Sequence, residues 1–192
     1  MTFPSIRMLT LFTATLVLAG CASTPPRQQQ EVRTLHREVV KLNQHMRQLT
    51  RQASALERQT LLNQHASAGA WLVPAARAPV ELESRAGPLR VSLEQVAMEA
   101  NGTRATLRLA ATRGGTLPAM TARVDWGPLD PVTGKPLAAE TLSQTLTLPA
   151  SLIARAETTV PLRLSGMTPE QLGFVRLYDV QVNSAAPAPP AR

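Results

Sequence analysis

Residues 28–66 read QQQEVRTLHREVVKLNQHMRQLTRQASALERQTLLNQHA, a run of 39 residues without a proline or a glycine. Most of these residues are good helix formers, so the run predicts one long helix. Apolar side chains recur in alternating steps of three and four, which is the heptad repeat of a coiled coil. These positions, here called the heptad stripe, are Val32, Leu35, Val39, Leu42, Met46, Leu49, Ala53 and Leu56. The stripe predicts a long amino-terminal coiled-coil helix.

The heptad stripe is narrow, as the contact between similar helices requires. A helix that lies on a globular core usually carries a wider apolar face. Each heptad contributes two side chains to the stripe. Valine at the first of these positions and leucine at the second favour a parallel dimer but do not exclude a trimer. We therefore expect a parallel homo-oligomer, a dimer or a trimer. The stripe weakens beyond Ala53, where Thr60 and Asn63 occupy the repeat positions. The alternative is a helix that packs against its own carboxyl-terminal domain.

The sequence changes period at Ser67, where glycine and proline appear and short alternating runs begin. These runs lie at residues 79–83, 89–96, 103–111, 119–126, 139–148, 158–165 and 174–182. Their alternation of apolar and polar residues predicts strands, and Asn101-Gly102 between two of them predicts a tight turn. Because no helical segment separates the runs, they predict a small antiparallel all-β sandwich over residues 67–183. The whole chain is therefore expected to be α+β by segments.

The strand spacing and the ending VRLYDV at residues 175–180 resemble the immunoglobulin-like modules of bacterial surface proteins. This resemblance implies an Ig-like sandwich. Trp126, on a middle strand, is expected in the core, which is the ordinary place for a strand tryptophan. Residues 184–192 (SAAPAPPAR) are rich in alanine and proline and are expected to form a disordered tail.

Upstream of the helix, residues 8–19 (MLTLFTATLVLA) form an uncharged run that follows Arg7. At about 1.5 Å per residue, a helix of this length cannot cross a bilayer core of roughly 30 Å, so the run predicts a secretory signal peptide. It ends in Leu18-Ala19-Gly20-Cys21, which holds the only cysteine of the chain and resembles the lipobox of bacterial lipoproteins. The resemblance implies a signal peptide at 1–20, a lipid on Cys21 that anchors the protein to a membrane, and a short tether at 21–27.

The residue after the cysteine is Ala22. In the sorting pattern of lipoproteins of this kind, an aspartate at that position signals retention in the inner membrane. Ala22 therefore implies the outer membrane, facing the periplasm. The chain is basic, with a formal net charge of +7. Because a signal peptide excludes nucleic acid as a partner, we expect an unknown envelope protein or an anionic envelope polymer instead.

The sequence marks no catalytic site. Residues 67–192 contain no histidine and no cysteine, which excludes Ser-His-Asp and Cys-His catalysis and His-ligated metals from this part. The three histidines lie on the helix, and no two are four residues apart, so no helical turn presents a histidine pair to a metal. We therefore expect no enzymatic activity, no cofactor and no metal.

Two functions fit the sequence best, and an envelope hydrolase that uses a pair of carboxylates is a third possibility. The first is a lipid-anchored structural or interaction protein of the cell envelope, in which a coiled-coil stalk presents a β-sandwich docking domain. The alternative is a periplasmic binding or carrier module that holds a small apolar ligand inside the β domain.

Overall fold

The computed structural model describes residues 26–66, 68–151 and 157–183. The predicted signal peptide at 1–20, Cys21 and the predicted tail at 184–192 lie outside these residues, as does most of the predicted tether. The chain divides into two compact units, and the boundary between them lies between Met46 and Arg47. The described part of the first unit is the amino-terminal portion of a helix. The second holds the end of that helix together with all the strands.

Helix α1 runs from Pro26 to Gln64, two residues earlier at each end than the sequence predicts. Proline suits this position because its missing N–H is one of the donors that a first helical turn leaves unpaired, and its fixed φ is already helical. Among the described residues, no helix has the length and the apolar character needed to cross a membrane.

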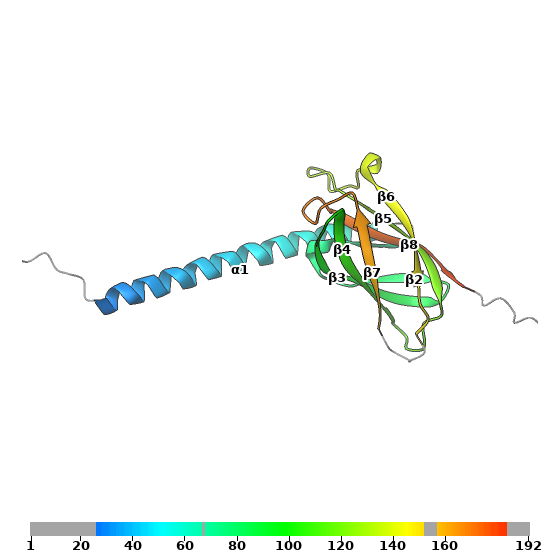
Figure 1. Cartoon of the computed structure of the whole chain (residues 1–192), viewed down its shortest axis with the longest axis horizontal. Helices are drawn as coiled ribbons and strands as arrows, with labels where there is room; N and C mark the ends of the chain where they lie inside the picture. The colour runs from blue at the N-terminus through cyan, green and yellow to red at the C-terminus, as the bar shows by residue number, and fades with distance from the viewer. Residues whose placement is uncertain (1–25, 67, 152–156, 184–192) are drawn as a thin grey trace, which may run out of the picture. The chain divides into compact units, whose positions relative to one another are not determined.

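The strands follow in chain order after α1 (Figure 1). They are β1 (Ala70–Leu72), β2 (Val80–Ser84), β3 (Gly87–Glu99), β4 (Gly102–Ala111), β5 (Met120–Gly127), β6 (Leu142–Leu148), β7 (Thr158–Ser165) and β8 (Phe174–Val182). Two short 3-10 helices, η1 (Pro74–Ala76) and η2 (Ala138–Glu140), lie between them. All seven predicted strands are thus confirmed, and the three-residue strand β1 was not predicted.

The strands form two antiparallel sheets. Sheet A has the order β1-β8-β5-β6, and sheet B has the order β2-β3-β4-β7. The inward side chains of the two sheets pack into one apolar cluster, built mostly from leucine, valine and alanine. Trp126 is buried there, which confirms its predicted place in the core.

Each sheet contains one β-bulge, which lies in the second strand of its order and faces the third strand. Gln95 and Val96 of β3 lie opposite the single residue Ala105 of β4. In the same way, Asp179 and Val180 of β8 lie opposite one residue of β5. In both bulges the first residue has a left-handed backbone, with φ of 51° at Gln95 and 50° at Asp179. The extra residue bends the bulged strand and increases its twist.

The fold prediction is wrong in its coiled-coil part. Among the described residues, α1 is a single helix with no second helix along it. The last turns of α1 pack on the β domain instead, through the polar side chains of Gln59 and Asn63. The heptad pattern had placed Asn63 at a repeat position and Gln59 beside it, in the weak last part of the predicted helix–helix contact. The Ig-like assignment is corrected as well. In the immunoglobulin fold the first strand pairs with the second, whereas here β1 pairs with the last strand, β8.

Candidate interaction surfaces

The heptad stripe is exposed along α1. Leu42 is 63% exposed, and the stripe side chains on either side of it are similarly open to solvent. Large apolar side chains in a continuous exposed row usually mark a surface that another molecule covers. The exposed members of the stripe are Val32, Leu35, Val39, Leu42, Met46, Leu49, Ala53 and Leu56.

The end of α1 is joined to the β domain by side-chain amides, which we call the amide joint. Gln59 is only 3% exposed. Its Oε1 accepts a hydrogen bond from the Val73 N–H at 2.8 Å, and its Nε2 donates to the Ala78 carbonyl at 3.1 Å. Asn63 bonds in a similar way to the backbone of Trp71. The amide joint therefore supplies backbone partners to the segment that contains β1 and η1.

A small apolar cluster accompanies the amide joint. Ala55 of α1 packs with Val73 and Ala76, and Leu62 lies partly buried against them. Ala55, Gln59 and Leu62 recur at helical spacing, but they lie on a different side of α1 from the heptad stripe. This is why Leu56 stays 44% exposed although its neighbour Ala55 is buried.

The connection from α1 to β1 is fixed by Gly69 and Arg176. Gly69 has a φ of +88°, and a Cβ there would lie 2.7 Å from the Leu177 carbonyl oxygen, so only glycine fits. Nη2 of Arg176 donates to the Ala68 carbonyl at 2.9 Å. The Arg176 guanidinium also lies 4.8 Å from the centre of the Trp71 ring, a cation–π distance. These contacts hold residues 68–71 against β8.

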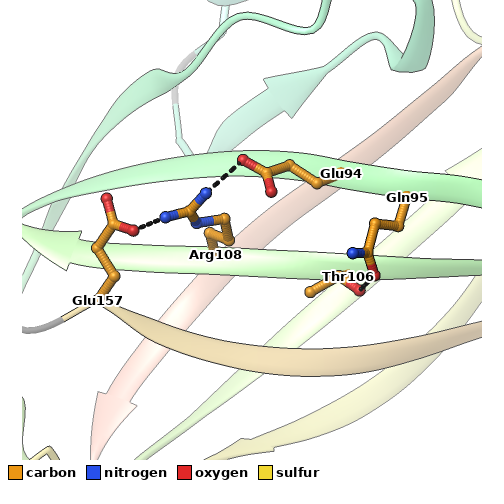
Figure 2. A network of polar contacts seen from close by, with 5 residues as sticks. All are labelled: Glu94, Gln95, Thr106, Arg108 and Glu157. Atoms are coloured by element: carbon orange, nitrogen blue, oxygen red, sulfur yellow. Dashed lines mark hydrogen bonds and ion pairs between the residues drawn. The ribbon is translucent and has the colours of Figure 1, made fainter.

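The outer face of sheet B carries a charged network, which Figure 2 shows from close by. Arg108 of β4 lies between two carboxylates, Glu94 of β3 and Glu157 just before β7, and forms an ion pair with each. Beside it, the Thr106 hydroxyl donates to Gln95 Oε1 at 3.2 Å. All three charged side chains are more than a third exposed, so these ion pairs contribute little stability.

The same face borders a hollow of about 830 Å³. Arg77, Arg90 and Arg108 line it together with Glu94 and Glu157. Apolar side chains, among them Leu93, Val96 and Leu109, complete the lining. This mixed lining differs from the mostly apolar lining of small-molecule sites. The space between the two sheets is occupied by the packed core cluster, so the described residues give that hypothesis no support.

The structure therefore places the predicted site residues in two classes. The heptad stripe from Val32 to Leu56 is present as an exposed row, whereas Cys21 lies outside the described residues. The residues that the sequence reasoning missed are Gln59 and Asn63. Both are uncharged amides near the end of the helix, where the heptad repeat weakens. This could have indicated their role, because a side-chain amide can form hydrogen bonds to backbone N–H and C=O groups of a neighbouring segment.

Known proteins resemble this chain over most of its length. The model of the family "Protein of unknown function (DUF3251)" matches residues 26–187. The uncharacterized lipoprotein YajI of Escherichia coli (strain K12) is 36% identical over 154 residues, which cover 80% of this chain and 86% of YajI.

Two solved structures share the fold. The solution NMR structure of YajI matches with a TM-score of 0.66 and 33% identity, covering 72% of this chain and 82% of that one. The trimeric lipoprotein SadB of Salmonella enterica matches with a TM-score of 0.53 and 18% identity, covering 82% of this chain and 86% of SadB.

Proposed function

The chain belongs to the DUF3251 family and is a bacterial lipoprotein, and from this we propose that it acts as a lipid-anchored interaction protein of the cell envelope. In this proposal Cys21 carries the lipid, and copies of the chain associate through the heptad stripe. The β domain is the part presented to a partner. We further propose the outer membrane as the site of anchoring, with the protein facing the periplasm, because Ala22 follows the cysteine.

The observation that carries this proposal is the exposure of the heptad stripe. A row of large apolar side chains is a liability in a soluble monomer, and association of like helices removes it from water. The amide joint leaves this row open, because Gln59 and Asn63 both come after Leu56, the last residue of the row. SadB, a protein of similar fold, is trimeric, which supports self-association here.

Membrane anchoring favours such association. Copies that carry a lipid at the same position are held in one leaflet and point the same way, so their effective concentration for each other is high. Parallel association is then the natural arrangement. At about 1.5 Å per residue, the 39 residues of α1 correspond to a helix about 58 Å long.

Site-specific photo-crosslinking in cells tests this function. The full lipidated chain would carry the crosslinker at Leu42, on the heptad stripe, or at Val40, which is exposed but lies off the stripe. Position 42 should give crosslinked multiples of the chain in the outer-membrane fraction, and position 40 should not. Equal yields at both positions, or a chain found only as a monomer, would contradict the proposal.

A further inference from the structure

The four sheet edges differ in how they are protected. Sheet A ends at β1 and β6, and sheet B ends at β2 and β7. The unpaired N–H and C=O groups along an edge strand form a template for another strand. Proteins therefore block most edges with a cover, a proline or charged side chains.

Three of these edges are blocked. The amide joint covers β1, since Gln59 and Asn63 bond to its backbone and to the residue after it. Strand β2 is short and carries two glutamates, Glu81 and Glu83, both exposed. Strand β7 contains Pro161, which has no N–H to offer.

Strand β6 has none of these protections. Its sequence, LSQTLTL, contains no charge, no proline and no glycine. It pairs with β5 over its whole length in regular register, without a bulge. Leu142 faces the core side, opposite Trp126, yet is 40% exposed. Within the described ranges, no backbone hydrogen bond reaches the outer side of β6.

We propose that β6 pairs with β6 of a second copy of this chain, antiparallel and with Thr145 opposite its own symmetry mate. A two-fold axis through this point makes the two copies of sheet A one continuous sheet. It places Ser143 opposite Thr147 on the outer face and Leu142 opposite Leu148 on the core face. Hydroxyl pairs and apolar pairs of this kind stabilise antiparallel strands.

The sequence of β6 favours a second copy over a foreign strand. Because the strand is uncharged, two copies meet without repulsion, and centring on Thr145 is the register that overlaps all seven residues. This contact lies on the β domain and is separate from the heptad stripe. It therefore goes beyond the proposed function and can fail or succeed independently of it.

Disulfide crosslinking tests the register. The protein used is the chain from Ala22 to Arg192, which has no cysteine of its own, with Leu42→Asp to disable the heptad stripe. Opposite residues of antiparallel strands have Cα atoms about 4.5–5.5 Å apart, within the range of a disulfide. Thr145→Cys should therefore form a dimer on oxidation. Thr147→Cys should not, because its symmetry mate lies four residues along the strand, about 14 Å away. Mixing the Ser143→Cys and Thr147→Cys proteins should restore a dimer.

Sedimentation velocity supplies the second measurement. At high micromolar concentration, the Leu42→Asp protein should sediment as a dimer, and adding Thr145→Lys should convert it to a monomer because two like charges then face each other. Thr159→Lys, at an exposed position of β7, is the matched control and should leave the dimer intact. A monomeric Leu42→Asp protein, or equal crosslinking at positions 145 and 147, overturns the β6 contact without bearing on the heptad stripe. If the partner of β6 is a strand of another protein, the Leu42→Asp protein is also a monomer, and the proposed pairing of two copies is wrong.

Discussion

Asn63 and Trp71 are joined by a pair of hydrogen bonds between one side chain and one backbone residue. Asn63 Nδ2 donates to the Trp71 carbonyl at 2.8 Å, and the Trp71 N–H donates to Asn63 Oδ1 at 3.0 Å. The Asn63 side chain thus offers β1 the donor and acceptor that a neighbouring strand would offer. Helix α1 in this way ends sheet A without adding a strand to it.

Removing the buried Gln59 side chain should destabilise the second unit. Gln59→Ala leaves the Val73 N–H and the Ala78 carbonyl without their partners, and an unsatisfied buried group costs about 1–3 kcal/mol. We expect the free energy of unfolding to fall by that amount or more in chemical denaturation. Gln64→Ala, at an exposed position on the same helix, is the control and should change it by less than about 0.5 kcal/mol. Equal effects would mean that the amide joint contributes no stability.

The β domain should fold without α1. A fragment from Ser67 to Val182 retains both sheets and the core cluster, so its circular dichroism should show β structure and a cooperative melt. A longer fragment that begins at Arg47 also retains the amide joint and the cluster around Ala55. Its Tm should be higher by roughly 5 °C or more. A shorter fragment without any transition would show that the helix is required for folding.

Charge on the heptad stripe should abolish association through α1. Leu42→Asp would place a carboxylate inside the proposed helix contact, where an unpaired charge costs several kcal/mol. In sedimentation velocity, with Thr145→Lys present in every protein to disable the β6 contact, the chain from Ala22 to Arg192 should be a dimer or trimer, and adding Leu42→Asp should make it a monomer. Val40→Asp, off the stripe, should behave like the unchanged chain. If the unchanged chain has the same sedimentation coefficient as Leu42→Asp, the stripe does not mediate association.

Replacing Cys21 should remove the anchor. The thiol is the proposed attachment point of the lipid, so Cys21→Ala should leave an unprocessed precursor with no acyl mass. Intact-mass spectrometry reports both effects, because a retained signal peptide adds the mass of residues 1–20 and a missing lipid removes the acyl mass. A Cys21→Ala protein that is still cleaved and still carries the mass of a lipid would disprove the assignment.

The carboxylate of Asp130 should make its turn sensitive to acid. Its pKa is lowered from the ordinary value of 3.8, first by the backbone N–H and then by the hydroxyl of Thr133, which donate at 2.6 and 2.9 Å. A lowered folded-state pKa means that the ion stabilises the turn above the unfolded pKa and loses this effect as pH falls through the folded value. An NMR titration should show the Asp130 carboxyl titrating below 3.8, with the Thr133 amide shift following it. An Asp130 carboxyl that titrates at or above that value would contradict this.

The strands could be predicted because their signal is local. Alternation of apolar and polar residues over runs of five to ten residues identified β2 to β8. The turn predicted at Asn101-Gly102 lies one residue earlier, at Ala100 and Asn101, because Gly102 already pairs with Glu99 as the first residue of β4. Strand β1 was missed because three residues are too few to show a period. It exists as a strand because β8 pairs with one side of it and the amide joint covers the other.

The pairing of the sheets and the role of the helix end could not be predicted in the same way. Strand order depends on contacts between residues far apart in the chain, such as β1 with β8, which periodicity does not encode. The heptad count placed Asn63 at an apolar repeat position and Gln59 beside it. Only the three-dimensional structure reveals that both amides meet backbone groups of another segment.

The two tryptophans of the chain lie in separate environments, which gives the protein two intrinsic optical reporters. Trp71 is partly exposed at the amide joint, beside the Arg176 guanidinium and with its ring centre 5.0 Å from that of Phe174. Trp126 is 5% exposed in the core, and its Nε1 donates to the Ser165 carbonyl at 3.2 Å. A Trp71→Phe or Trp126→Phe chain would leave a single emitter. Fluorescence from the unlabelled protein could then distinguish release of the helix end from loss of the sandwich core.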